Sequence, residues 1–300
     1  AEALIDTLEI GNESIRASML CDLAPYLSAD LLNKALGAAR KIEYGPARAN
    51  ALVSLAPYLP ERKQTKALMD ALHTTDAIID EAIRATMLHK LAPYLPVNLL
   101  NEALGVARTL VDEPIRAVVL GMLAPYLPAD LMSEALRIAY VIRDEGSRAD
   151  ALSGVAPHLP VDLMNEVLCI IRKFKDEHTK AITLCALAPH LSESQRAKTL
   201  TETLNVIKTI IDESALADAL GRLAPYLSDD LMKETLGIVR VIGHEGSRVD
   251  ALGALASHLS GDLINEALGI VHNIGHGFFR ASALCVLIPY LPENERINAL

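Results

Sequence analysis

The sequence predicts an all-α fold, an α-solenoid of about nine helical hairpins that forms either an open superhelix or a closed toroid. A hexapeptide related to LAPYLP occurs nine times, and its first residue lies at 23, 55, 91, 123, 155, 187, 223, 255 and 287. Successive copies are therefore 32 or 36 residues apart, a period typical of stacked two-helix units. Apolar residues make up 51% of the 300 residues and aromatic residues only 4%, which favours closely packed helices over sheets.

Both halves of each unit have the periodicity of a helix. In the first half of one unit, an apolar face is formed by Ala17, Leu20, Leu23, Ala24 and Leu27. In the second half of another, it is formed by Leu131, Met132, Ala135, Leu136, Ala139 and Ile142. The 36-residue units carry four extra residues around Glu61–Ala71 and Glu193–Thr203. Four residues are about one helical turn, so the second helix is expected to start one turn earlier there.

The hexapeptide is expected to be the turn between the two helices. It contains 13 of the 15 prolines, eight of them at its third position. A proline late in a helix removes one hydrogen bond and presses on the carbonyl four residues back, where the residue is usually small, as Cys21 and Gly121 are. We therefore expect a kink at this point. A second proline, as at Pro60, suits the first turn of the next helix, and a serine, as at Ser192, suits its cap.

One hairpin alone would not bury enough apolar surface to offset the entropy of ordering its residues, so neighbouring units must cover each other. This predicts a single repeat domain over residues 1–300. A longer period is also present, because RDEGSRADALSGVAPHL at 143–159 returns as GHEGSRVDALGALASHL at 243–259, an offset of 100 residues. We therefore expect three super-repeats, at 1–100, 101–200 and 201–300.

The unit DEPIRAVVLGMLAPYLP at 112–128 resembles the repeats of HEAT-like and TPR-like helical solenoids. The resemblance lies in an acidic residue, an apolar–Arg pair and an aliphatic helix, and it is best at Ile15-Arg16, Ile83-Arg84 and Ile115-Arg116. The acid and the Arg are closer together than in HEAT repeats, the period is shorter than in most of them, and the Trp-Leu-Gly-Tyr pattern of TPR repeats does not occur. The resemblance implies protein–protein binding or scaffolding, and it also fits an interaction region of a larger signalling protein.

Charge and hydropathy argue against two classes of partner. The net charge is −10, and binding to nucleic acid depends on phosphate neutralisation by Lys and Arg, so no nucleic-acid partner is expected. No apolar stretch reaches the ~18 residues that a membrane span requires, and no signal peptide opens the sequence, so no membrane association is expected. Three of the four cysteines, Cys21, Cys185 and Cys285, occupy one repeat position, which predicts reduced thiols and a cytoplasmic location.

Two charged columns recur at the start of the first helix. Seven of the nine units carry a glutamate there, and most carry a basic residue three positions later, as in Glu113 and Arg116. Residues at i and i+3 are neighbours on a helix, and acids suit its first turn. We expect an inter-repeat ladder of ion pairs in preference to an anion-binding site.

The fourth residue of the hexapeptide is aromatic in every copy. Six copies have a tyrosine, at Tyr26, Tyr58, Tyr94, Tyr126, Tyr226 and Tyr290, and three have a histidine, at His158, His190 and His258. Both residues combine an apolar body with a polar tip. The column is either a plug at the helix end with its tip hydrogen-bonded, which we favour, or an aromatic stripe for a partner peptide.

Two columns of the first helix vary among the repeats, whereas the core columns stay Leu or Ala, so we expect the variable columns to be exposed. Candidate partner-binding residues in the first column are Val118, Asp150, Asp218 and Asp250. Candidates in the second column are Lys90, Met122 and Arg222. The apolar residues among them are candidates for an exposed hydrophobic patch that binds a partner. Neutral drift at an unconstrained surface is the alternative.

No catalytic motif stands out. His272 and His276 are four residues apart, with His244 one repeat earlier, but Gly275 and Gly277 break the helix, so no metal site is predicted. Phe278 stands where Ser or Pro usually occurs, and it either repacks locally or forms an exposed docking residue. There is no nucleophile elbow and no phosphate-binding glycine loop, so no enzymatic activity and no cofactor are expected.

The two ends of the sequence complement each other. Joined end to end they read LPENERINALAEALIDTLEIGNE, which aligns without a gap to LPERKQTKALMDALHTTDAIIDE at 59–81. We therefore expect one of three arrangements: a window from a longer array, a unit whose two half-helices meet in a ring or head to tail between copies, or ordinary frayed ends.

These observations predict a non-enzymatic scaffold that binds a protein or peptide, either by itself or as one region of a larger protein. The alternative is a structural module that self-assembles into a ring or filament by completing the split terminal helix.

Overall fold

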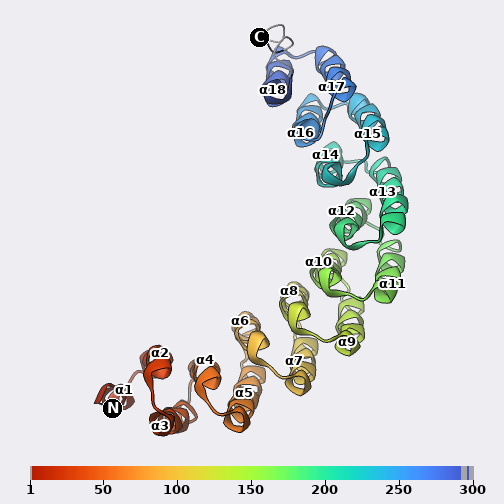
Figure 1. The fold of residues 1–300 in the computed structure, drawn as a ribbon. Coiled ribbons are helices and arrows are strands. Elements are labelled where there is room, and N and C mark those ends of the chain that lie inside the picture. The colour runs from red at the N-terminus through yellow and green to blue at the C-terminus, as the bar shows by residue number, and fades with distance from the viewer. Residues whose placement is uncertain (1, 292–295, 297–300) are drawn as a thin grey trace. The chain divides into compact units, whose positions relative to one another are not determined.

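The computed structural model describes residues 2–291 and 296, and within them every regular element is helical. The chain divides into two compact units, residues 1–160 (unit 1) and residues 161–300 (unit 2). In each unit the helices alternate between two layers (Figure 1). We name the first helix of each predicted hairpin an A helix and the second a B helix.

In unit 1 the A helices are α2 (Glu13–Leu23), α4 (Gly45–Leu55), α6 (Glu81–Leu91), α8 (Glu113–Leu123) and α10 (Glu145–Val155). The B layer of unit 1 consists of α1 (Glu2–Glu9), α3 (Ala29–Ala39), α5 (Glu61–Asp76), α7 (Val97–Thr109) and α9 (Ala129–Tyr140).

In unit 2 the A helices are α12 (Glu177–Leu187), α14 (Glu213–Leu223), α16 (Glu245–Ala256) and α18 (Gly277–Leu287). Its B helices are α11 (Val161–Ile171), α13 (Glu193–Ile207), α15 (Asp229–Val241) and α17 (Asp262–His272). The predicted all-α solenoid of helical hairpins is confirmed. The single domain of 1–300 and the three super-repeats stay predictions.

Each hexapeptide that contains proline at its third position folds as a short turn. The A helix stops at the first residue of the motif, and the next three residues form a 3₁₀ helix, as in η1 (Ala24–Tyr26). The α-helix therefore ends where a kink was predicted, because proline has no N–H to continue the ladder. Where Ser257 replaces the proline, α16 runs one residue further and no 3₁₀ helix follows it.

The last residue of the hexapeptide lies just before the B helix. Pro60, Pro96 and Pro128 occupy the N-cap position, one residue earlier than the first-turn position that was predicted. Among the serines, Ser192 forms a capping box with Gln195, and Ser228 accepts from Leu231 N at 3.5 Å. Ser28 forms no side-chain cap, and Ser260 precedes Gly261, which is the N-cap of α17 at φ 48°. The serine caps are therefore only partly confirmed.

The four extra residues of the 36-residue repeats lie in the B helix. Helix α5 has 16 residues and α13 has 15, whereas α3 and α11 have 11 each. This confirms that the insertion adds about one helical turn to the second helix.

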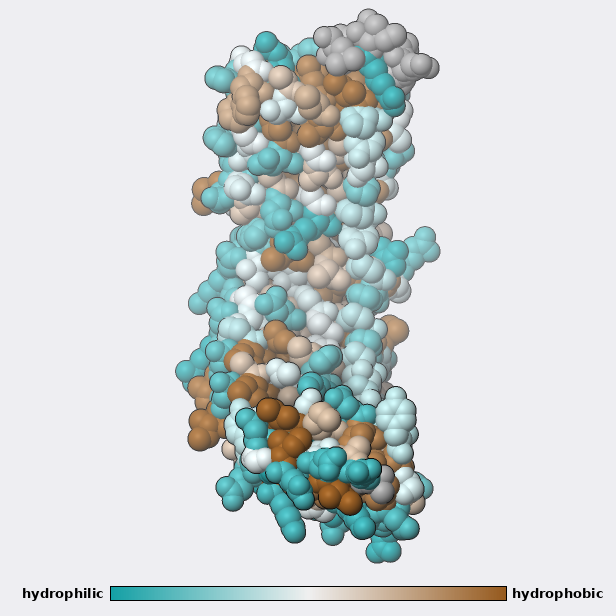
Figure 2. Space-filling view, turned by 90° about the vertical axis from the view of Figure 1, so that its left-hand side faces the viewer, coloured by the Kyte–Doolittle hydropathy of each residue, from teal (hydrophilic) through white to brown (hydrophobic). Residues whose placement is uncertain are grey.

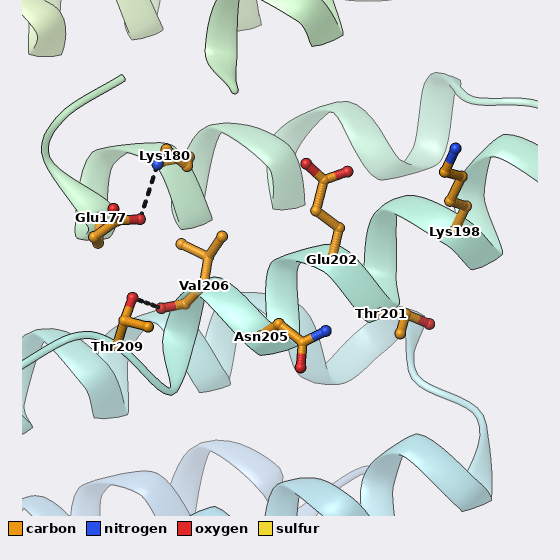
Figure 3. A pocket seen from close by; sticks show the side chains of 8 residues that line it. All are labelled: Glu177, Lys180, Lys198, Thr201, Glu202, Asn205, Val206 and Thr209. Atoms are coloured by element: carbon orange, nitrogen blue, oxygen red, sulfur yellow. Dashed lines mark hydrogen bonds and ion pairs between the residues drawn. The ribbon is translucent and has the colours of Figure 1, made fainter. Parts of the chain in front are cut away.

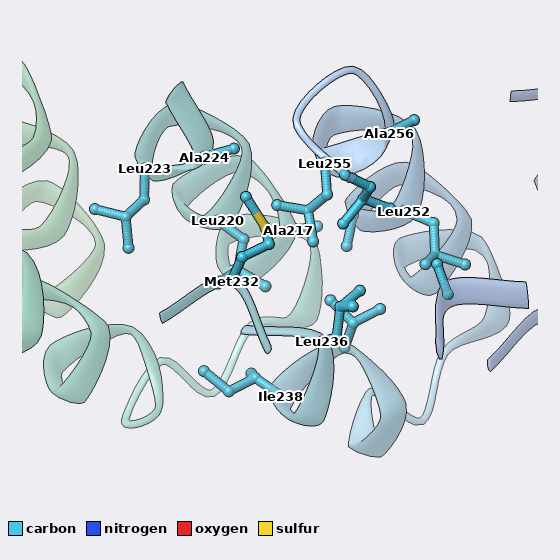
Figure 4. Close-up of a cluster of buried hydrophobic side chains, with 14 of the residues drawn as sticks. Ala217, Leu220, Leu223, Ala224, Met232, Leu236, Ile238, Leu252, Leu255 and Ala256 are labelled. Carbon is cyan, nitrogen blue, oxygen red and sulfur yellow. The ribbon is translucent and has the colours of Figure 1, made fainter. Parts of the chain in front are cut away.

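Both units bury aliphatic side chains between the layers, and in unit 2 these form one continuous core. In unit 2 it includes Leu220 and Leu252 from A helices and Leu236 from a B helix, all of them fully buried (Figure 4). Adjacent A helices come very close because small residues lie at their contact. A Cβ placed on Gly154 of α10 would lie 2.9 Å from Gly121 Cα of α8, so any larger side chain there would force the helices apart.

Candidate protein-binding surface

The eight predicted binding residues lie on A helices, and seven of them lie on a surface that we name the A face. It consists of the two variable columns, to which Phe278 does not belong. Seven of the eight candidates are exposed, namely Lys90, Val118, Asp150, Asp218, Arg222, Asp250 and Phe278. Met122 is only half-buried rather than exposed, because it lies where α8 approaches its neighbour through Gly121. In the view of Figure 2, hydrophobic residues form separate patches among hydrophilic ones.

In unit 2 the A face has a groove between α14 and α16, with a volume of about 540 Å³. Its floor is narrow because Gly221 lies against Ala254, and a Cβ on Gly221 would be 2.8 Å from the Ala254 Cβ. Asp218, Arg222 and Asp250 line it. The structure therefore brings three of the predicted residues together.

The two aspartates that line this groove differ in their partners. Arg222 Nε donates to Asp218 Oδ2 at 2.9 Å, and His178 Nε2 of α12 lies 3.2 Å from the same oxygen. Burial acts to raise the pKa of Asp218, but Arg222 and His178 outweigh it, so the pKa is lowered. Asp250 is exposed and forms no ion pair within the described residues. A basic group of a partner would therefore meet an unpaired carboxylate at Asp250.

In unit 1 the A face has a second groove, of about 500 Å³, between α2, α4 and α6. Lys90 lies in it, and its Nζ donates to Asn50 Oδ1 of α4 at 2.8 Å. Cys21 lines the same groove, and burial raises the pKa of its thiol. Val118 and Asp150 lie on α8 and α10 of this unit, and neither lines this groove.

Phe278 lies on the surface of unit 2, away from the charged groove. Its side chain is 68% exposed, and its ring packs edge-on against Phe279 at a centroid distance of 5.4 Å. Phe279 in turn packs on the buried core of the unit. The exposure fits the docking alternative, although Phe278 also has a local contact, and its role stays a prediction.

The glutamate column links neighbouring hairpins, but not in the predicted way. Each of five carboxylates accepts the backbone N–H groups of residues 30 and 31 positions later, just before the next A helix begins; these are Glu13, Glu81, Glu113, Glu213 and Glu245. For Glu113 the two distances are 3.0 Å to Arg143 N and 2.8 Å to Asp144 N. We name this edge of each unit the linked edge.

The basic column stays within its own hairpin. Arg116, for example, donates to the carbonyl of Leu110, six residues earlier, at 3.0 Å. The ion pairs that form in the column join residues three apart on one helix, as Arg16–Glu13 at 3.2 Å and Lys180–Glu177 at 2.9 Å do. The predicted ladder of ion pairs between repeats is therefore wrong. The glutamates accept hydrogen bonds from backbone N–H groups of the next hairpin and not from its guanidinium groups.

These hydrogen bonds change the acidity of the glutamates. The N–H donors at residues 43 and 44 lower the pKa of Glu13, and those at Asp144 and Arg143 lower the pKa of Glu113. Glu81 and Glu213 have lowered pKa values for the same reason. An N–H group that points at a carboxylate stabilises its charged form.

The long hairpins differ at the linked edge. In the first of them Gly45 occupies the glutamate position, and in the second Glu177 pairs with Lys180. A pocket of about 770 Å³ opens beside Glu177 and Lys180, with Lys198 and Glu202 further along α13. Figure 3 shows these charged ends spread along the two helices, not converging on one point. The pocket is therefore an open groove and not an arrangement of catalytic groups.

The tyrosine column of unit 1 is exposed. Tyr26 is 83% exposed, and Tyr58, Tyr94 and Tyr126 are 44%, 44% and 39% exposed. Within the described residues, none of these hydroxyl groups has a protein hydrogen-bond partner. The prediction that the tip is hydrogen-bonded is therefore wrong for these four residues. In unit 2, Tyr226 is half-buried and packs against the core.

Two of the three histidines that were weighed as metal ligands serve as helix caps. His244 Nδ1 accepts from Ser247 N at 3.1 Å, and His276 Nδ1 accepts from Phe278 N at 3.3 Å. His272 is the last residue of α17 and caps no A helix, whereas the other A helices except α4 have Asp or Asn at the cap position, as Asp112 does. Across residues 2–291 and 296, no group of three or more His, Cys, Asp or Glu side chains could hold a metal ion.

Three features were missed at the level of sequence. His178 and Asn50 each contact a candidate residue 40 positions away, which no spacing within one repeat reveals. Exposed aliphatic residues also follow the buried loop residue at the linked edge, at Ile79, Val111 and Ile211, whose exposures are 93%, 80% and 95%. Their position one residue after a buried Ile or Leu was visible in the alignment of the repeats.

Two further predictions concern the cysteines and the membrane. Cys21, Cys169, Cys185 and Cys285 are all free, as predicted, and burial raises the pKa of Cys185 to about 12. Among the described helices, none combines the length and the apolar character needed to cross a bilayer.

The fold is similar to that of Kap121p, a HEAT-repeat karyopherin. Kap121p bound to Nup53p matches with a TM-score of 0.65 and 13% identity, and Kap121p bound to Ste12p with 0.65 and 14%. Kap121p bound to Pho4p matches with 0.64 and 15%. Each match covers 96% of this chain and 37% of Kap121p, so the chain spans little more than a third of that protein.

The chain is thus a HEAT-like helical repeat solenoid, and at this identity the likeness concerns the fold alone. The sequence matches no protein-family model and no curated protein.

Proposed function

We propose that this chain is a non-enzymatic scaffold that binds a protein or peptide along its A face. The observation that carries this proposal is the groove between α14 and α16, where an unpaired, exposed Asp250 lies beside the Asp218–Arg222 pair. The small residues Gly221 and Ala254 form its floor, so a partner side chain can approach the helix backbones closely.

The groove favours a partner segment that presents a basic group. Asp218 is already paired with Arg222 and lies within hydrogen-bond distance of His178, whereas Asp250 forms no ion pair within the described residues. The net charge of −10 attracts basic segments over a longer range and speeds their association. Kap121p has been captured with Nup53p, Pho4p and Ste12p, so a fold of this kind can hold partner proteins.

The test is a selection of displayed random peptides on the immobilised full chain, followed by calorimetry with the enriched peptides. Peptides that bind the groove should carry Lys or Arg. Asp250→Lys should weaken them by about tenfold or more, because it removes the attraction and adds a repulsion. The matched control is Glu166→Lys, a charge reversal of an exposed acid on the B helix α11 of the same unit, which should change the affinity less than about twofold.

Two outcomes would contradict the proposal. Either no peptide is enriched above background, or Asp250→Lys and Glu166→Lys weaken binding equally, which would indicate a general charge effect and no A-face site.

The self-assembly alternative concerns residues that the structure mostly does not describe. The half-helix that would complete the first helix includes residues 292–295 and 297–300, which lie outside the described part of the chain. Head-to-tail association therefore stays a prediction, and so does the cytoplasmic location. Light scattering of the purified chain separates a monomer from a defined ring or polymer.

A further inference from the structure

The turns of unit 1 present a repeated Pro–Tyr pair, in which the proline ends the A helix and both side chains stay exposed. The pairs are Pro25–Tyr26, Pro57–Tyr58, Pro93–Tyr94 and Pro125–Tyr126, and all eight residues are exposed. Each pair lies at the second and third positions of a 3₁₀ helix, from η1 to η4, so the backbone holds all four in the same conformation. We name this row the tyrosine edge.

Neighbouring pairs of the row share one concave surface. Pro57, Tyr58, Pro93 and Tyr94 line the same groove of about 500 Å³, together with Asp22 from α2. Their rings offer flat apolar surface, and the tyrosine hydroxyls have no protein partner within the described residues. A ligand would therefore meet apolar rings and free O–H donors at regular intervals.

The spacing of the row fits one type of peptide backbone. Packed helices lie about 8–10 Å apart, so successive pairs recur at about that distance along the unit. A polyproline II helix has three residues per turn and a rise of about 3.1 Å per residue, so it repeats every ~9 Å. One residue in three would thus face each successive tyrosine, and the unpaired carbonyls of this backbone would accept from the hydroxyls.

The charges of the groove select the flanking residues. Lys90 Nζ donates to the neutral Asn50 Oδ1 at 2.8 Å and so stays charged, and Asp22 of the same groove is exposed and forms no ion pair within the described residues. An unpaired carboxylate on a chain of net charge −10 favours a basic side chain next to the prolines.

We propose that the tyrosine edge binds a proline-rich segment of a partner protein in the polyproline II conformation, with a Lys or Arg beside Asp22. This inference rests on the proposed binding function, but it concerns a different groove in a different unit from the α14–α16 groove. The tyrosines supply the stacking surface, and Asp22 fixes the direction of the peptide.

The experiment measures fluorescence anisotropy of a labelled synthetic peptide with full-length protein. The peptide has a proline at every third position and one arginine at its end, and a second peptide has the same composition in an order without that period. The periodic peptide should bind saturably and at least about tenfold more tightly than the reordered one. Tyr58→Ala with Tyr94→Ala should weaken it by about tenfold or more.

The matched control is Tyr44→Ala, because Tyr44 is 51% exposed but lies at the N-cap of α4, at the opposite end of that helix. This variant should leave the affinity unchanged. Asp22→Asn, at an exposed site where folding is not at risk, should weaken the arginine peptide by about threefold and leave an arginine-free peptide unaffected.

The inference is overturned if the periodic peptide does not bind saturably, if the reordered peptide binds as well, or if neither the double tyrosine variant nor Asp22→Asn weakens binding. If the displayed-peptide selection succeeds while this test fails, only the tyrosine edge is refuted. If the selection fails as well, the proposed function falls with it.

Discussion

The linked edge and the tyrosine edge repeat with the same period but differ in what their residues contact. At the linked edge, Glu13, Glu81 and Glu113 of unit 1 each bind two backbone N–H groups of the following hairpin. At the tyrosine edge, the repeated rings are exposed and their hydroxyls lack protein partners within the described residues. The comparison teaches that the repeated residues of the linked edge hold neighbouring hairpins together, whereas those of the tyrosine edge form a regular surface that is available for binding.

Acidification should break the linked edge most strongly. The folded-state pKa values of Glu13, Glu81, Glu113 and Glu213 lie below the ordinary value of 4.5, so these groups stabilise the folded chain fully above pH 4.5. Their contribution is lost as the pH falls through 4.5 and then through the lowered values. We expect the melting temperature to fall by roughly 10 °C or more between pH 7 and pH 3, measured by circular dichroism.

The control for this prediction is the variant in which all four glutamates are replaced by glutamine. It should be less stable at pH 7 and should lose much less on acidification, because glutamine does not titrate. An equal loss in wild type and variant would contradict the role of the linked edge.

A single link should have a smaller effect. Glu113→Ala removes the acceptor of Arg143 N and Asp144 N, and we expect the melting temperature to fall by about 2–4 °C. Glu43→Ala is the matched control, since Glu43 is an exposed loop acid without a side-chain partner in the described structure. If both variants lower the melting temperature equally, the link does not stabilise the stack.

The hairpin turns provide a weaker perturbation. Ser257 stands where other turns have proline, and its φ of −69° suits a proline ring. Ser257→Pro should raise the unfolding free energy by at most about 0.4–1 kcal/mol, because the restriction of the unfolded chain is opposed by the loss of the hydrogen bond from Ser257 N–H to Leu255 O. Chemical denaturation measures this change, and a crystal structure should show α16 ending at Leu255. A destabilised variant would show that the extended helix is required there.

The smallest effect is expected at the tyrosine edge. Tyr26 is 83% exposed and has no hydroxyl partner within the described residues, so Tyr26→Ala should change the unfolding free energy by less than about 0.5 kcal/mol. A clear loss of stability in the same denaturation assay would mean that this edge also holds the stack together, and the contrast between the edges would disappear.

Much of the fold could be predicted because it depends on local periodicity. The apolar spacing and the repeated prolines determine where the helices lie and where each turn falls. The helix end at the first motif residue, in place of a kink, depends on how the 3₁₀ turn closes, as in Leu27 N to Ala24 O at 3.4 Å. That closure depends on backbone geometry, which residue spacing does not describe.

The binding surface was harder to predict because its contacts cross between repeats. The columns of Glu113 and Arg116 suggested ion pairs between repeats, whereas the Glu113 carboxylate accepts from the backbone N–H of Asp144 in the next hairpin. Met122 belongs to a variable column but is half-buried, because Gly121 draws α8 toward α10. The exposure of Asp218, Arg222 and Asp250 was predicted correctly, whereas His178 as a neighbour of Asp218 required the stacked structure.

Hydrogen–deuterium exchange on the full chain tests the contrast between the edges most directly, with and without the periodic proline peptide. In the free protein, the amides of Val111, Asp112, Arg143 and Asp144 should be protected, and Glu113→Gln should reduce protection at Arg143 and Asp144 selectively. Adding the peptide should slow exchange around Tyr58 and Tyr94 and leave the linked edge unchanged. Rapid exchange of those four amides in the free wild-type protein would contradict the account.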